Sequence, residues 1–218
     1  MKMIVIDLQK DALDNQISTL DLLRKAYLVA RKLHLKDFEE WAEHELNGYS
    51  KADTLPPYRK IKGEVIALNI THGGTLPVTL PNDDFVDLIC VRDTYDSIAH
   101  LKNIYDTTSN NFINIPLAES INQTLSKMSN YPTKFALSVS TSQLYNIIET
   151  TRNHLLKWAI TLEENGILGE DMQFTDTERT IATTSTIYNY TNINIFMRDV
   201  KDTQIQQDST DSIQEMDN

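Results

Sequence analysis

The residues best suited to acid–base chemistry on a phosphate are Arg152 and His154. In enzymes that cleave RNA, an arginine can stabilise the charge of the phosphate while a histidine exchanges a proton. Positions two apart on a helix point to different sides, so this spacing does not by itself bring the two side chains together. With Arg59 they form the candidate catalytic set of a nuclease. The alternative is structural, with Arg152 anchoring a buried or half-buried carboxylate.

Metal, thiol and phosphate-loop chemistry have weaker support. Glu40 and His44 lie one helical turn apart, but the second histidine that a zinc-protease helix needs would fall at position 48, which is glycine. Cys90 is the sole cysteine and lies in an apolar run, which favours a small buried side chain. None of the six glycines precedes a lysine, so there is no phosphate loop. We therefore predict no metal and no cofactor.

Helices dominate the elements expected to position these residues. Residues 1–46 have apolar positions at helical spacing, and Ser18 is the expected N-cap of the second helix. A basic segment (24–36) followed by an acidic one (37–46) predicts a helical hairpin with ion pairs across or beside its seam. Residues 144–163 carry the clearest apolar stripe, which ends at Asn165 and Gly166, and Ser140 to Ser142 can cap this helix. Residues 83–128 are expected to form two or three shorter helices.

Strand patterns are fewer. Two prolines predict a rigid, extended connector at residues 55–59. Residues 60–71 then alternate as a strand, Gly73 and Gly74 turn the chain, and residues 76–80 can return beside it. Alternation at Phe135, Leu137 and Val139 predicts another strand of about seven residues. The fold class is therefore α+β, with helices around a small antiparallel sheet.

Composition limits the classes of function. The chain has 218 residues, 40% of them hydrophobic, and a formal net charge of −11. This size supports one core, which we place at residues 1–182. The negative charge disfavours binding to nucleic acid or to a membrane surface. Only four consecutive apolar residues precede Asp7, too few for a secretory signal, so we expect a cytoplasmic protein.

Residues 183–218 differ in composition and form a β-prone acidic tail. Asn, Thr, Tyr and Ile dominate its first part, and six acids against one lysine follow after residue 198. One interpretation is a solvated tail. The other is a short β element formed between subunits, whose apolar contacts would come from Ile193, Ile195, Val200 and Ile205.

Taken together, several segments resemble the AbiTii domain of bacterial abortive-infection proteins, over about residues 4–180. The segments are residues 22–33 with Trp41, 45–49, 55–59 with Gly63, 152–163, and 166–178. In the tail, residues 199–207 resemble the end of the family, although Arg198 and Asp208 stand where glycines commonly flank the motif. The resemblance implies phage defence, with a partner protein in some systems, and no settled enzymatic activity.

Within the resembling segments, we predict one polar contact, between Glu45 and Arg59. The pair is either architectural or part of a recognition groove with Tyr49 and Tyr58. The tryptophans of the resemblance are expected in the core, because each lies on an apolar helix stripe.

The leading hypothesis is a non-enzymatic sensor or assembly subunit that oligomerises, or binds a second defence protein or a phage protein. The alternative is a nuclease-type toxin that uses Arg59, Arg152 and His154. A third possibility is a small nucleotide signal bound by aromatic residues, for which Tyr49, Tyr58 and Tyr95 are candidates.

Overall fold

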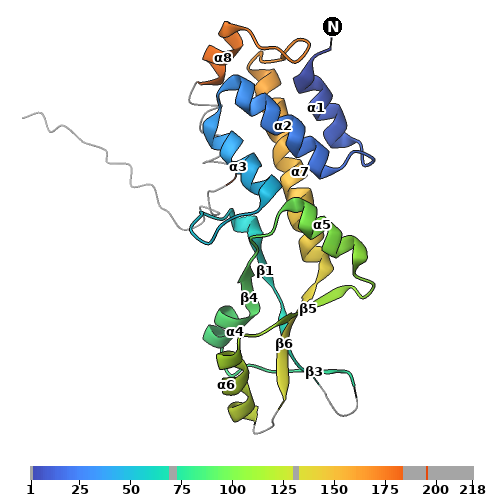
Figure 1. Ribbon diagram of the computed structural model, residues 1–218, viewed down its shortest axis with the longest axis vertical. Helices are drawn as coiled ribbons and strands as arrows, with labels where there is room; N and C mark the ends of the chain where they lie inside the picture. Colours follow the sequence, from blue (N-terminus) through green and yellow to red (C-terminus); the bar gives the residue numbers. More distant parts are fainter. Residues whose placement is uncertain (1, 69–72, 130–132, 184–194, 196–218) are drawn as a thin grey trace, which may run out of the picture.

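The computed structural model describes residues 2–68, 73–129, 133–183 and Ile195. The molecule is elongated, with a helical bundle at one end and a sheet at the other (Figure 1). The bundle contains α1 (Ile4–Leu13), α2 (Thr19–Leu33), α3 (Lys36–Asn47), α5 (Ile98–Thr107), α7 (Thr141–Glu164) and α8 (Asp176–Ala182). The other end contains α4 (Asp83–Cys90) and α6 (Glu119–Ser129) with the strands β1 (Lys60–Lys62), β2 (Glu64–Leu68), β3 (Thr75–Pro77), β4 (Val91–Asp93), β5 (Phe112–Pro116) and β6 (Lys134–Ser140). The predicted α+β class is confirmed.

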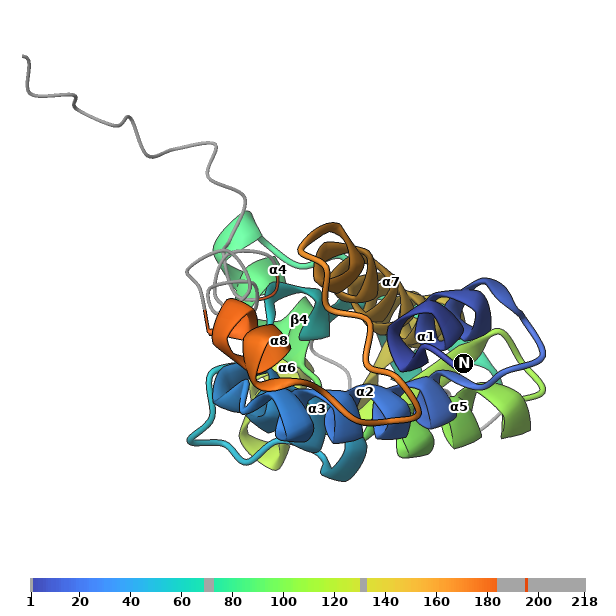
Figure 2. The ribbon, with the colours of Figure 1, turned by 90° about the horizontal axis from the view of Figure 1, so that it is seen from above.

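The bundle is built around α7, which packs against α1, α2 and α5. Seen from above, α2 and α3 lie along one side and α7 along the other (Figure 2). The predicted caps are present: the side chain of Ser18 accepts a hydrogen bond from the backbone of Asp21, and that of Ser140 from Ser142. One ion pair, from Arg31 on α2 to Glu39 on α3 at 3.5 Å, crosses the predicted basic–acidic seam.

The larger sheet has four antiparallel strands in the order β3-β2-β6-β5. β1 and β2 form one strand path interrupted at Gly63: β1 pairs with β4, and β2 pairs with β6. A Cβ atom at Gly63 would lie 2.6 Å from the carbonyl oxygen of Ser138. Only glycine therefore allows the chain to pass so close to β6 where it changes partners.

Two predictions of local structure were wrong in part. Residues 83–128 contain three helices, as expected, but also β4 and β5, which we did not predict. β5 alternates exposed and half-buried residues against β6, a tertiary pairing that its short length hid in the sequence. The connector ends in a 3₁₀ turn, Pro57–Arg59, instead of staying extended. Proline at the first position of a helical turn accounts for this, because its fixed φ suits that position.

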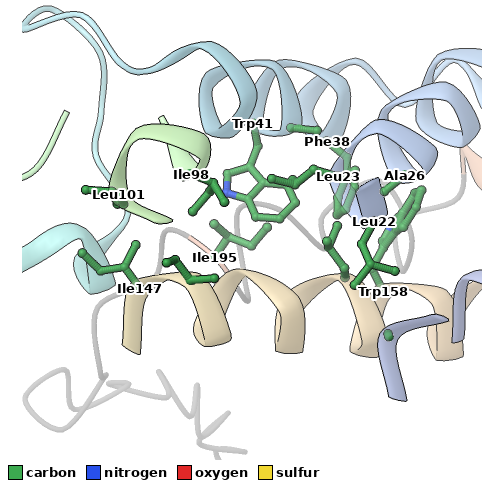
Figure 3. Packing of buried hydrophobic residues seen from close by; sticks show 14 of the residues in the cluster. Leu22, Leu23, Ala26, Phe38, Trp41, Ile98, Leu101, Ile147, Trp158 and Ile195 are labelled. Carbon is green, nitrogen blue, oxygen red and sulfur yellow. The ribbon is translucent and has the colours of Figure 1, made fainter. Parts of the chain in front are cut away.

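Ile195 lies in the core of the bundle, although it follows α8 in the sequence. Its side chain is 2% exposed and belongs to the main hydrophobic cluster. Figure 3 places Ile195 between Trp41 of α3 and α7, near Ile98 and Ile147. Ile195, one of the four residues proposed for oligomerisation, is thus buried in the core of its own chain. The other three, Ile193, Val200 and Ile205, lie outside the described residues.

Among the described residues, no helix combines the length and the apolar composition needed to cross a membrane.

Candidate functional site

The predicted site begins at the last turn of α3, where Glu45 is completely buried. Gly48 ends the helix with φ +94°, a conformation that glycine adopts readily. A Cβ atom there would lie 3.0 Å from the carbonyl oxygen of Tyr95, which also accepts a hydrogen bond from the backbone of Tyr49 at 2.8 Å. The helix end therefore fits closely against the segment that leads into α5.

Arg59 reaches Glu45 from the 3₁₀ turn, and the predicted contact is confirmed. Nε of Arg59 donates to Oε1 of Glu45 at 3.1 Å, and Nη2 donates to Oε2. Nη1 donates to the backbone carbonyl of Asp96. Both side chains of the ion pair are 0% exposed. This two-pronged geometry is the strong form of an arginine–carboxylate pair.

Three hydroxyl groups complete the surroundings of Glu45. Those of Tyr49 and Tyr58 each donate to Oε1 at 2.8 Å, and that of Thr151, on α7, is 3.3 Å from Oε2. Tyr58 in turn accepts a hydrogen bond from the indole of Trp41 at 2.9 Å. We call these residues the Glu45 cluster: Trp41, Glu45, Tyr49, Tyr58, Arg59 and Thr151. It joins α3, the 3₁₀ turn and α7.

The electrostatics of the cluster keep its donors protonated. Burial and the charge of Glu45 raise the pKa values of Tyr49 and Tyr58 well above those of free tyrosine. Burial alone would lower the pKa of Arg59, but the charge and hydrogen bonds of Glu45 outweigh it, and that pKa is raised. The guanidinium of Arg59 therefore stays charged and the two tyrosine hydroxyls stay neutral near neutral pH.

Arg152 and His154 point to different places, as their spacing predicts. Arg152 donates hydrogen bonds to backbone carbonyls of Ala12, Asp14 and Ile17, around the turn between α1 and α2. The ring of His154 instead lies beside the Glu45 cluster, 5.4 Å from the ring of Tyr58 between centroids. The carboxylate that we expected beside Arg152 is Glu149, 3.8 Å away and only partly buried. The three residues of the nuclease hypothesis thus do not share one set of contacts.

His154 is held in its neutral form. Burial, with a smaller effect from Lys157, lowers its pKa to about 4, although the charge of Glu45 acts in the opposite direction. A neutral histidine at pH 7 can accept or donate one proton, but the low pKa makes it a weak base.

The other candidates have structural surroundings. His44 lies 3.6 Å from a carboxylate oxygen of Asp53, and its ring packs against Tyr49. Within the described ranges, no three His, Cys, Asp or Glu side chains gather as a metal site would require. Cys90 is buried, and burial raises the pKa of its thiol.

Sequence reasoning missed two members of the cluster, Trp41 as a hydrogen-bond donor and Thr151. A signal existed for Thr151, because it is a polar residue on the apolar stripe of a long helix. Such a residue must find a partner when it is buried.

Removing both partners of the buried pair should cost much less stability than the sum of the two single losses. Glu45→Ala leaves a buried guanidinium without its carboxylate, and we expect a loss of about 3–5 kcal/mol in the free energy of unfolding. Arg59→Ala should cost a similar amount, and the double variant clearly less than the sum of the two. Urea unfolding of all four proteins measures this cycle. Asp106→Ala, which breaks the exposed Lys102–Asp106 pair, is the control and should cost under about 1 kcal/mol. Additive losses at positions 45 and 59 would contradict the coupling.

Stability should also depend on the protonation of His154. Its pKa is about 4 in the folded protein, against about 6.5 in the unfolded chain, so the unfolded state binds the proton more readily. Stability from this group is full above pH 6.5 and is lost as the pH falls towards 4. Relative to His154→Gln, the wild type should lose on the order of 2 kcal/mol between pH 7 and pH 4.5. Parallel unfolding curves of both proteins across this range would show that His154 contributes nothing.

Comparison with known proteins identifies a family for most of the chain. The family model described as AbiTii matches residues 3–187, most of the chain. Among curated proteins and among solved structures, none matches the chain. The matched range contains the whole Glu45 cluster as well as Arg152 and His154. The chain belongs to the AbiTii family, and this membership implies a role in phage defence by abortive infection.

Proposed function

We propose that this AbiTii protein is a non-enzymatic component of abortive infection, which acts by assembling with further copies of itself or by binding another protein. The observation that carries the proposal is the burial of the Glu45 cluster. Glu45 and Arg59 are both 0% exposed, and their hydrogen bonds are made inside the chain. Glu45 and Arg59, which lie in segments that resemble the AbiTii domain, thus stabilise the fold. The role in defence then falls to the surface of the protein.

The same burial favours the architectural interpretation of Glu45, Tyr49, Tyr58 and Arg59 over the recognition groove. Tyr49 is 7% exposed, and its hydroxyl is already committed to Glu45. A partner that used these side chains would have to break their contacts with one another. Binding at the cluster would therefore require a rearrangement of α3 and the 3₁₀ turn, whereas the outer surface is available as it stands.

Exposed apolar side chains at the sheet end support contacts with protein. Leu76, Leu88, Phe112 and Met128 are each 50–70% exposed, with Leu88 at 70% and Met128 at 50%. A contiguous exposed apolar patch is typical of a surface that meets another protein, and these four residues come from four different elements of the sheet end.

The tail is the segment proposed to join copies of the chain, through Ile193, Val200 and Ile205 or residues near them. A deletion variant tests this role of the tail. Because Ile195 fills the bundle core, the deletion should leave this residue in place and begin at residue 197. Deletion of residues 197–218 should lower the number of subunits measured by light scattering, while the melting temperature stays close to that of the full chain. An unchanged number of subunits would contradict assembly through Val200 and Ile205. A deletion from residue 183 is the control for Ile195 and should also lower the melting temperature.

The nuclease alternative requires His154 to transfer a proton, whereas the non-enzymatic proposal does not. If the protein is not an enzyme, His154→Gln should protect a culture from phage as well as the wild type does, because the neutral ring does no proton transfer. Plating efficiency of a phage that the wild type restricts measures this, with expression and melting temperature checked in parallel. Loss of protection by a stably folded variant, together with loss of nucleic-acid cleavage by the purified protein, would favour the toxin enzyme.

A further inference from the structure

A pocket opens on the side of the bundle between the α1–α2 turn, the start of α5 and the first half of α7. Its volume is about 600 Å³, within the range of sites for small organic ligands. No member of the Glu45 cluster lines it. The lining residues that bear on its chemistry are Ala99, Lys102, Tyr145, Glu149 and Arg152.

Arg152 gives the pocket a buried positive charge. The residue is 8% exposed, and its three hydrogen bonds go to uncharged backbone carbonyls. Its guanidinium has five N–H groups, so two of them have no hydrogen bond to the described residues. The nearest carboxylate, on Glu149, is 3.8 Å from Nε, beyond hydrogen-bond distance. One remaining donor is on Nε, which forms this long ion pair with Glu149, and the other, on Nη2, suits an anionic group that enters the pocket.

Two helices add to the positive potential. The first residues of α2 and of α5, helices of 15 and 10 residues, both line the pocket. Backbone N–H groups at a helix N-terminus favour an anion. Lys102 contributes a further cation at the rim, where it is paired with Asp106. The single acidic residue in the pocket lining is Glu149.

The side chains that α7 contributes to the pocket differ in chemical type along the helix. Tyr145, Glu149 and Arg152 are spaced by four and three residues, so they lie on one face over about 10 Å. Tyr145 is 44% exposed, and its ring stacks on that of Tyr105 with centroids 5.2 Å apart. An aromatic surface, a carboxylate and a guanidinium therefore follow one another along the wall of the pocket.

We propose that this pocket binds a ribonucleoside phosphate. The base would stack on Tyr145, a ribose hydroxyl would donate to Glu149, and the phosphate would lie against Arg152 and the two helix N-termini. The three parts of such a ligand occur in the same order as the three side chains. This site is separate from Tyr49, Tyr58 and Tyr95, the aromatic residues that we first considered for a nucleotide. The inference does not rest on the proposed function, since binding can be measured whatever the protein's oligomeric state.

Isothermal titration calorimetry with AMP, GMP, CMP and UMP tests the proposal on the full chain. At least one of them should bind saturably with a dissociation constant below 1 mM, while its nucleoside and inorganic phosphate alone should each bind at least tenfold more weakly. Tyr145→Ala should weaken binding of the best nucleotide about tenfold, through loss of base stacking. If none of the four nucleotides binds, or phosphate binds as tightly as the best of them, the proposal fails.

Matched variants place the binding in the pocket. Ala99→Trp should fill it and abolish binding, whereas Asn103→Trp, one turn along α5 and outside the lining, should leave the affinity unchanged. The wild type should prefer the ribonucleotide to its 2′-deoxy form about tenfold, and Glu149→Ala should remove that preference. Glu164→Ala, at the exposed end of α7, is its control. Equal affinities for Ala99→Trp and Asn103→Trp would place any binding elsewhere, and a preference that survives Glu149→Ala would overturn the assigned orientation.

Discussion

The fold depends on one buried carboxylate. Taking Glu45 and Arg59 out of water costs several kcal/mol for each ion, and their mutual attraction offsets this only when the remaining donors and acceptors are also satisfied. Here two tyrosines and a threonine bond to Glu45, and a backbone carbonyl accepts from Arg59. The requirement for many partners explains why the pair sits where α3, the 3₁₀ turn and α7 converge. A simple apolar contact would hold these elements together, but it would not fix their orientation as narrowly.

The same pair also positions the sheet. The backbone carbonyl of Arg59 accepts a hydrogen bond from Thr94 at 2.9 Å, immediately before β1 starts and after β4 ends. Arg59 therefore anchors both strands of the β1–β4 ladder, and through Gly63 the direction in which β2 enters the larger sheet. The two ends of the elongated molecule are linked by this junction and by α7, which follows β6 directly in the chain.

Sequence patterns predicted the elements whose stabilising groups are local. Ser18, Ser140 and Gly166 mark helix ends through contacts within a few residues, and the stripe on α7 is long enough to be unambiguous. β4 and β5 escaped prediction because short strands depend on partners far away in the sequence. The Glu45–Arg59 contact could be predicted from charge and resemblance. The part played by Thr151, 106 residues from Glu45, could not, because only the folded structure brings the two together.

The position of Ile195 has a consequence for synthesis of the protein on the ribosome. The bundle helices α1, α2, α3, α5, α7 and α8 are translated before this residue, yet the space between Trp41 and α7 stays unfilled until residue 195 has emerged. Domains tend to fold from their N-termini as they are made. A nascent bundle would therefore expose the apolar surface between Trp41 and α7 to chaperones and proteases. A chain that stalls after α8 would carry helices α1 to α8 and still be a target for degradation.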